Sequence, residues 1–325
     1  MKKHFKKLLL MALMAVMAVG LIACGTDKSD NESTKEEKTS VTITSLDASK
    51  NEIELEVPYN PKRIAILDLA CLDIIDELGV GDRVVGMAST SIDYLEKYSN
   101  DASIKNLGTI KEADLEAVME CEPDIIFIGG RLSKSYDALS EIAPVVYLAT
   151  DTNEGLVNSV SKNAKTIASI FGMEDKVDSL MSDFGARIDT IKKISSGKTA
   201  LVGMTTSGSF NLLGNDGRCS LIGVEAGFNN LTAAGSTSTH GNESSFETVV
   251  QQNPDYIFVM DRDSAISTAG AKTAKEIVEN ELVKTADAYK NNHIIYLEHS
   301  NVWYTAEGGI QALDIMLTDL EKCLK

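Results

Sequence analysis

The sequence lacks the motifs that mark the common enzyme classes. Its 325 residues contain no GxSxG nucleophile motif, no HExxH zinc motif and no GxxxxGK[ST] phosphate loop. Histidine is scarce, with four residues in all, and no acid–base pair converges in the sequence. We therefore expect a binding protein rather than an enzyme.

Cysteine is scarce as well. The five cysteines show no CxxC spacing, which argues against a disulfide framework or a thiolate metal site. Cys71 and Cys121 stand among apolar residues, which is typical of buried thiols. A zinc or manganese receptor would also need a denser cluster of histidines and carboxylates than this chain offers.

Basic residues are outnumbered, with 31 Lys and Arg against 48 Asp and Glu and a formal net charge of −17. Four of the lysines fall within the first 23 residues, which leaves 27 basic against 48 acidic residues in the remainder, a net charge of −21. Such a chain is a poor partner for nucleic acid or anionic lipid headgroups. A local cluster of arginines is then informative, because the overall charge does not attract anions.

The first 23 residues predict an export signal. Four lysines precede an apolar stretch, residues 8–22, which is too short and too one-sidedly flanked for a typical spanning helix. The signal ends in LIACG, residues 21–25, which resembles a bacterial lipoprotein signal. That resemblance implies that Cys24 becomes the mature N-terminus and carries a lipid anchor. An ordinary cleaved signal with a chance cysteine is the alternative.

The rest of the chain divides by composition and pattern. Residues 24–40 are polar and predict a flexible tether. Residues 41–155 alternate short apolar strands with helices, as residues 197–325 do, which predicts two α/β lobes. Residues 156–196 carry no strand signal and predict connecting helices. The second of these, 173–194, would span roughly 30 Å as one continuous helix.

One segment occurs twice, at an offset of 131 residues. LEAVMECEPDIIFIGGR at 115–131 is echoed by FETVVQQNPDYIFVMDR at 246–262, with Glu, Pro, Asp, Ile, Phe and Arg in matching places. Each copy reads as a helix, a Pro-Asp stop and a short buried strand, with Arg131 or Arg262 just past the strand. Because the carboxyl ends of strands face the ligand crevice in open α/β sheets, the two arginines are expected at a shared site. Solvated surface arginines are the alternative.

These features resemble one family, the iron–siderophore-binding lipoproteins of ABC importers, and within it the receptors for catecholate-type siderophores such as petrobactin. The resemblance rests on the lipoprotein signal, the duplicated units, the long connector, the THG at 239–241 and the VWY at 302–304. It implies two Rossmann-like lobes joined by a rigid helical backbone, the class III periplasmic-binding-protein fold, with ligand in the cleft between them.

The resemblance also implies roles for single residues. Arg131, Arg218 and Arg262 match the arginines that face an anionic ferric catecholate. His240 and Tyr304 match a pair that completes the coordination of iron when the siderophore supplies too few donors. Trp303 is expected either to pack against a catechol or to be an ordinary core tryptophan.

Partners follow from the same resemblance. Glu116 and Glu247 match the acidic residues, one per lobe, that dock on the permease, and a separate ATPase supplies the energy. The ligand is an Fe(III)–siderophore complex, with no permanent cofactor. We expect a monomer, held by lipid at the extracellular face of the cell membrane.

The chemistry of these side chains suits a ferric catecholate independently of the family resemblance. Guanidinium groups hydrogen-bond catechol oxygens and stack on their rings, and phenolate oxygen is a suitable ligand for the hard ferric ion. A haem receptor is the nearest alternative, with His240 and Tyr304 as axial ligands, but its site should be flat and apolar with fewer arginines. A cobalamin receptor or a purely structural surface lipoprotein would explain less of the pattern.

Overall fold

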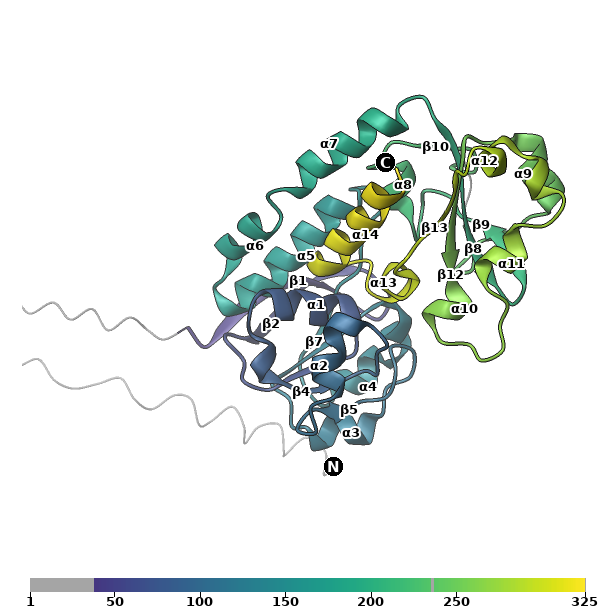
Figure 1. The fold of residues 1–325 in the computed structure, drawn as a ribbon. Coiled ribbons are helices and arrows are strands. Elements are labelled where there is room, and N and C mark those ends of the chain that lie inside the picture. Colours follow the sequence, from purple (N-terminus) through teal and green to yellow (C-terminus); the bar gives the residue numbers. More distant parts are fainter. Residues whose placement is uncertain (1–37, 235–236, 325) are drawn as a thin grey trace, which may run out of the picture. The chain divides into compact units, whose positions relative to one another are not determined.

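Two mainly parallel β-sheets, each flanked by helices, form the framework of the part of the chain that the structure describes (Figure 1). The structure is a computed structural model that describes residues 38–234 and 237–324. The predicted signal peptide at 1–23, the lipid site at Cys24 and the tether up to residue 37 lie outside the described residues. From Lys38 onward the chain forms one compact unit.

The first sheet has five parallel strands in the order β5-β4-β3-β6-β7. Its strands are short and, apart from the exposed edge strand β5, mostly buried, as expected for parallel strands that are covered on both faces. We refer to residues 41–155, which contain this sheet, as the first lobe. The strands are β3 (Ile64–Ile66), β4 (Val84–Met87), β5 (Lys105–Asn106), β6 (Ile125–Ile128) and β7 (Val145–Tyr147).

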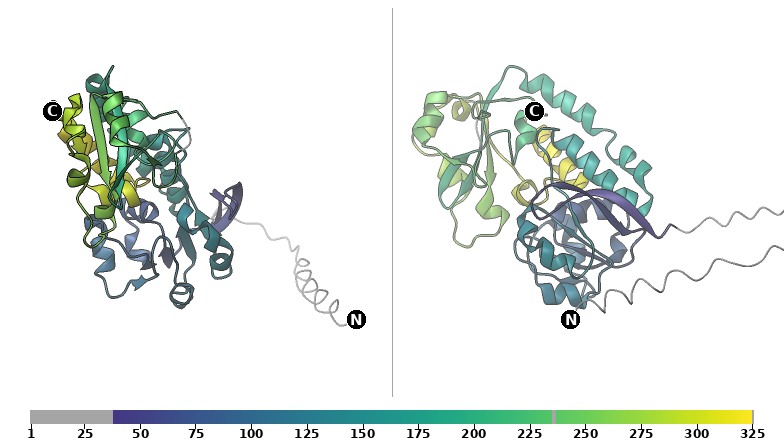
Figure 2. Two further views of the ribbon diagram at one scale, coloured as in Figure 1. Left: turned by 90° about the vertical axis from the view of Figure 1, so that its right-hand side faces the viewer. Right: turned by 180° about the vertical axis from the view of Figure 1, so that it is seen from behind.

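Helices and an antiparallel hairpin surround this sheet. The hairpin pairs β1 (Ser40–Leu46) with β2 (Glu52–Pro58), and it lies against the first connecting helix (Figure 2). The helical segments are α1 (Leu69–Glu77), η1 (Gly81–Arg83), η2 (Asp93–Leu95), α2 (Glu96–Ser99), α3 (Leu115–Glu120), η3 (Gly130–Ser135) and α4 (Tyr136–Ser140).

The connector consists of three helices rather than the two predicted. The first, α5 (Leu156–Phe171), ends at Gly172 in the left-handed conformation, as its sequence predicts. The predicted continuous helix over 173–194 is wrong, because α6 (Glu174–Leu180) and α7 (Phe184–Ser195) are separate. At the break the Ser182 hydroxyl donates to the Ser179 carbonyl at 2.9 Å, a local bond that competes with the helical pattern.

The second sheet has the order β11-β9-β8-β12-β13, with β10 paired to β8. Strand β12 runs parallel to β8 and β13, whereas β9 and β11 extend the sheet in antiparallel fashion. We refer to residues 197–325 as the second lobe. The strands are β8 (Thr199–Thr206), β9 (Ser209–Leu212), β10 (Asn229–Asn230), β11 (Asn242–Glu243), β12 (Tyr256–Asp261) and β13 (Ile294–Tyr296).

The two copies of the repeat occupy equivalent places in the two sheets. In each, the Asp after the Pro accepts backbone hydrogen bonds from the start of the neighbouring parallel strand. Asp124 accepts from the amides of Lys62 and Arg63, and Asp255 accepts from the amide of Thr199 at 2.8 Å. The repeat is therefore a structural duplication, which delivers β6 and β12 in the same register against their partners.

The remaining helical segments belong to the second lobe and end in a long C-terminal helix. They are α8 (Ser220–Gly223), α9 (Phe246–Gln252), α10 (Arg262–Ala265), α11 (Ala274–Val278), η4 (Val283–Thr285), α12 (Asp287–Lys290), α13 (Ser300–Thr305) and α14 (Ile310–Cys323). Figure 1 shows α14 lying alongside α5 and above α1, and it packs against α1, α5 and α7.

Both lobes share one hydrophobic core. A single buried cluster includes Ile66 and Leu72 of the first lobe, Ile167 of the connector, and Val202 and Leu313 of the second lobe. Burial of this shared surface stabilises one relative arrangement of the lobes. The α/β fold class predicted from the sequence is confirmed by this architecture and by its structural relatives described below.

Within residues 38–234 and 237–324, we find no helix with the length and apolar character that crossing a bilayer requires.

Candidate ligand-binding site

Three arginines converge on one tyrosine. The guanidinium carbons of Arg131, Arg218 and Arg262 lie 5.5, 4.5 and 5.6 Å from the ring centroid of Tyr304. All four residues are predicted site residues, and they come from segments up to 173 residues apart in the sequence. The structure therefore brings together residues of both lobes around a single aromatic ring, in cation–π geometry.

Each arginine reaches this place from a defined position in the fold. Arg131 lies in η3, directly after β6, and Arg262 opens α10, directly after β12. These are the matching positions of the duplicated unit, at the carboxyl ends of equivalent strands. Arg218 comes from the segment before α8, where Cys219 holds a left-handed backbone with φ of 61°.

Neutral acceptors hold Arg131 and Arg218 in place, whereas Arg262 also contacts a carboxylate. Arg131 donates to the Tyr304 carbonyl at 2.8 Å, and Arg218 donates to the Thr239 carbonyl at 3.0 Å. Arg262 donates from Nε to the Tyr304 hydroxyl at 3.2 Å, and it also forms an ion pair with Asp263 at 3.2 Å. Among the described residues, neither Arg131 nor Arg218 has a carboxylate at ion-pair distance, so neither charge is neutralised by direct contact.

The environment of Tyr304 makes its hydroxyl easier to ionise. Burial raises the pKa of the hydroxyl, but the hydrogen bond from Arg262 and the charges of Arg218, Arg262 and Lys111 outweigh burial, so the pKa is lowered overall. The ionised form of tyrosine is the form that binds hard metal ions.

His240 lies in the field of the same cations. It is exposed, and its pKa is lowered by partial burial and then by the charges of Arg262, Arg218 and Lys111. The imidazole is therefore held in its neutral form, which is the form that coordinates metals. Its main chain is anchored because Asn211 donates to the His240 carbonyl at 2.8 Å.

A cavity of about 810 Å³ opens beside the cluster. This volume is within the usual range for small-molecule sites. Both lobes and helix α5 line it, and the predicted residues at its wall are Arg131, Arg218 and Tyr304. Arg262 and His240 do not line it, although Arg262 contacts the Tyr304 hydroxyl.

Trp303 does not belong to the cavity. Its side chain is fully buried, and its indole nitrogen donates to Asp319 of α14 at 2.9 Å. The prediction that this ring packs against a catechol is wrong, and the alternative of a core tryptophan is correct. Trp303 and Tyr304 are adjacent in the short helix α13, so the two rings leave that helix in different directions.

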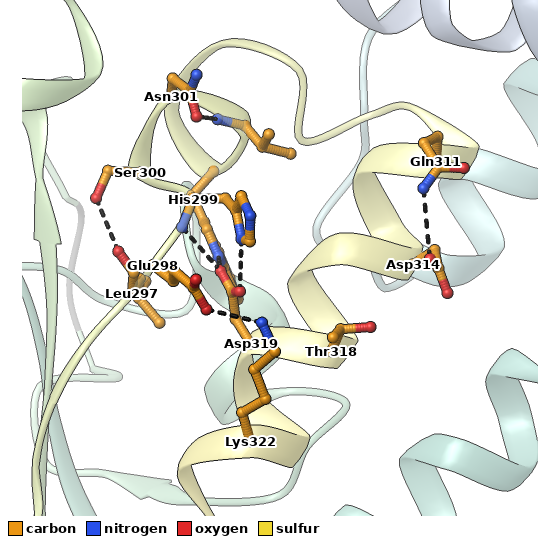
Figure 3. A network of polar contacts seen from close by, with 12 residues as sticks. Leu297, Glu298, His299, Ser300, Asn301, Gln311, Asp314, Thr318, Asp319 and Lys322 are labelled. Atoms are coloured by element: carbon orange, nitrogen blue, oxygen red, sulfur yellow. Dashed lines mark hydrogen bonds and ion pairs between the residues drawn. The ribbon is translucent and has the colours of Figure 1, made fainter. Parts of the chain in front are cut away.

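The network around Asp319 fixes helix α13. Figure 3 shows Asp319 accepting from the backbone and the ring of His299, and Lys322 pairing with Glu298 at 2.8 Å. Both oxygens of the buried Asp319 are thereby occupied by donors of the protein. Although Glu298, His299 and Asp319 lie close enough to hold a cation, their contacts are those of a structural anchor for the helix that carries Tyr304.

Glu116 and Glu247 lie at equivalent places on the surface. Each occupies the first turn of a short helix, α3 or α9, and each is exposed. The side chains of Asp114 and Ser245 cap these two helices in the same way. The exposed side chain of Met119 lies one turn after Glu116, which adds an apolar contact surface beside the carboxylate.

The sequence pattern did not indicate three charged residues that lie near the cluster: Lys111, Asp68 and Glu307. Asp68 lies two residues after the end of β3, so the rule that identified Arg131 after β6 could have identified it too. Lys111 and Glu307 lie in connecting loops, and only the folded structure brings their charges close to Tyr304 and to the arginines.

Comparison with known proteins identifies the family. Residues 64–300 match the family model described as periplasmic binding protein. This match spans more than half of the chain. The protein belongs to the periplasmic binding protein family.

Individual relatives agree with this assignment. The petrobactin-binding protein YclQ of Bacillus subtilis is 35% identical over 98% of this chain and 99% of its own. Its crystal structure superposes with a TM-score of 0.81, covering 88% of this chain and 99% of that one. The periplasmic catecholate-siderophore binding protein VctP from Vibrio cholerae is 30% identical, with a TM-score of 0.78 and coverage of 87% and 100%. The probable siderophore-binding lipoprotein YfiY of Bacillus subtilis is 28% identical over 99% and 98% of the two chains.

Proposed function

We propose that this protein is the extracytoplasmic solute-binding lipoprotein of an ABC importer and that it captures a ferric catecholate-type siderophore. The observation that carries the proposal is the cluster of three arginines around Tyr304 at the edge of a cavity lined by both lobes. The relatives named for petrobactin and for a catecholate siderophore support the same ligand class.

The chemistry of the cluster suits a ferric catecholate. Such a complex is an anion with flat aromatic rings, and guanidinium groups both neutralise the charge and stack on the rings. Arg131 and Arg218 line the cavity and would contact the catechols, whereas Arg262 acts through the Tyr304 hydroxyl. His240 and Tyr304 would supply the missing donors when the siderophore fills only part of the coordination shell of its iron.

A haem or cobalamin receptor fits less well. Haem is best held in a flat, apolar site with an axial ligand, whereas the wall here carries guanidinium and carboxylate groups. The similar proteins described above are named for siderophores.

Delivery would follow capture. Lipid on Cys24 would hold the protein at the outer face of the cell membrane, and Glu116 and Glu247 would contact basic pockets on the permease. The shared core of the two lobes favours a small closure on ligand binding rather than a wide hinge motion. The protein would act as a monomer, with no permanent cofactor, and a separate ATPase would drive transport.

Calorimetry with defined ligands tests the ligand class. The mature chain, produced without its lipid, would be titrated with preformed ferric tris- and bis-catecholates, a ferric hydroxamate and haem. Tight binding of the catecholates alone would support the proposal. Binding of haem alone would favour the haem receptor, and no binding of any of them would refute the ligand class while leaving the family assignment unchanged.

A further inference from the structure

Glu307 occupies an unusual place beside the arginine cluster. It follows Tyr304 by three residues, in the loop between α13 and α14, and its side chain lines the cavity. One of its carboxylate oxygens accepts a hydrogen bond from the backbone amide of Cys219 at 2.8 Å. Because Cys219 directly follows Arg218, this bond fixes the backbone that presents Arg218 to Tyr304.

Acidic residues lie near all three arginines of the cluster, and Glu307 acts on Arg131 as well as on Arg218. Asp263 pairs with Arg262, Asp68 acts electrostatically on Arg131, and Glu307 acts on Arg218. When all three carboxyl groups are ionised, they offset much of the charge that would attract an anionic ligand. Protonation of a carboxyl group would restore that charge.

Burial raises the pKa of both Asp68 and Glu307, and Glu307 is the one that is hydrogen-bonded to the segment carrying Arg218. Burial raises the pKa of Glu307 to about 7, and this effect outweighs the hydrogen bond from Cys219 and the attraction of Arg218. Glu225 raises the pKa of Glu307 further and Arg131 lowers it. Near neutral pH the empty site therefore contains both forms of Glu307. An anion beside Arg218 would repel the ionised form and favour the protonated one.

We propose that Glu307 is the titratable counter-charge of the arginine cluster, so that an anionic ligand binds together with a proton on this carboxyl group. The inference rests on the proposed function, since it requires an anionic ligand at the cavity. It predicts that the affinity for the ligand rises as the pH falls. Linkage requires this, because a ligand that increases proton binding to Glu307 is itself bound more tightly at a higher proton concentration.

Other groups near the cluster also titrate, so the test compares variants. Glu307→Gln keeps the length of the side chain and an oxygen that accepts from Cys219, but it cannot ionise. Asp216→Asn is the matched control, because Asp216 also lines the cavity. Hydrogen bonds from Thr237 lower the pKa of Asp216, so it stays ionised throughout the neutral range.

The experiment is calorimetry with a preformed ferric tris-catecholate at pH 8, in two buffers that differ in ionisation enthalpy. The difference in heat gives the number of protons taken up on binding. We expect close to one proton more for the wild type than for Glu307→Gln, and no change for Asp216→Asn. Between pH 7 and 8.5 the affinity of the wild type should fall by up to about tenfold per pH unit relative to Glu307→Gln.

An equal proton count in the wild type and Glu307→Gln would overturn the inference and leave the proposed function intact. Absence of binding by the wild type at every pH would refute both. If Glu307→Gln does not fold by circular dichroism, infrared difference spectra of the wild type decide. A protonated carboxyl band that grows on ligand binding at pH 8 is expected, and its absence would refute the proposal.

Discussion

Arg131 of the first lobe donates a hydrogen bond to the main-chain carbonyl of Tyr304 in the second lobe at 2.8 Å. The bond joins residues that are 173 positions apart. The site therefore depends on the relative placement of the lobes, which the shared core and helix α14 determine. An arginine held by a carbonyl keeps its positive charge and is already oriented for a ligand.

Replacing this arginine tests its role in binding. Arg131→Ala should weaken a ferric tris-catecholate by about 10- to 100-fold, since a charge-assisted hydrogen bond contributes roughly 1.5–3 kcal/mol. Calorimetry provides the measurement. Lys134→Ala is the control, because it removes the same charge from an exposed position in the same segment η3. Equal effects of the two substitutions would mean that only long-range charge matters.

Tyr304 and His240 should matter for only some ligands. Tyr304→Phe and His240→Ala should each alter the visible charge-transfer band of a bound ferric bis-catecholate, because the bis complex leaves coordination sites that these donors would fill. A tris-catecholate has no such vacancy, so its band should not change. Tyr147→Phe is the control, since it removes a hydroxyl from the wall of the same cavity. A band that is identical in all variants would exclude direct coordination.

The duplicated unit made much of this site predictable. Arg131 and Arg262 follow matching strands, and the strand-end rule places such residues at one edge of a sheet. Arg218, His240 and Tyr304 lie in irregular or short segments, for which local pattern gives no position, and only the family resemblance indicated them. Trp303 was predicted wrongly because it is adjacent to Tyr304 in the sequence, whereas neighbouring side chains on a helix point about 100° apart.

The connector shows a second limit of prediction from sequence. An apolar stripe with helical spacing continues through 173–194, yet the chain turns between α6 and α7. The hydrogen bond from the Ser182 hydroxyl to the Ser179 carbonyl competes with the helix there, and the spacing of apolar residues does not reveal it.

Trp303 offers a test of the corrected assignment. Trp303→Phe should lower the free energy of unfolding by about 1–3 kcal/mol, because the buried carboxylate of Asp319 loses one of its three donors. Ligand affinity should stay nearly constant, since the indole does not reach the cavity. Denaturant titration and calorimetry measure the two quantities. A large loss of ligand affinity with unchanged stability would mean that Trp303 does contribute to the binding site.

The role of Glu116 and Glu247 in transport can be tested separately from ligand binding. Glu116→Lys and Glu247→Lys should leave affinity for a ferric catecholate unchanged, because both side chains are exposed on α3 and α9. Uptake of radiolabelled ferric siderophore by cells that rely on this protein should fall strongly, since each change reverses the charge expected to contact the permease. Glu141→Lys, an exposed position elsewhere in the first lobe, is the control. Normal uptake by both variants would exclude a docking role.

Asp73 is a buried carboxyl group at the contact between α1 and α14. It lies on α1 of the first lobe, is fully buried, and accepts from the amides of Gln311 and Ala312 at the start of α14 and from the Tyr94 hydroxyl at 2.6 Å. Burial raises its pKa from 3.8 to about 6, against the opposing effect of these hydrogen bonds. A carboxyl group whose folded pKa is raised stabilises the fold below its unfolded pKa and loses that contribution as pH rises.

The pH dependence of stability therefore has a defined sign. Between pH 4 and 7, the free energy of unfolding of the wild type should fall relative to Asp73→Asn by up to about 3 kcal/mol, since each pKa unit corresponds to 1.36 kcal/mol. The change should be concentrated between pH 4 and 6 and be complete above that range. Urea titrations at several pH values measure it. A shift in the opposite direction would mean that the folded pKa of Asp73 lies below 3.8. In that case the hydrogen bonds from the amides of α14 would lower the pKa by more than burial raises it.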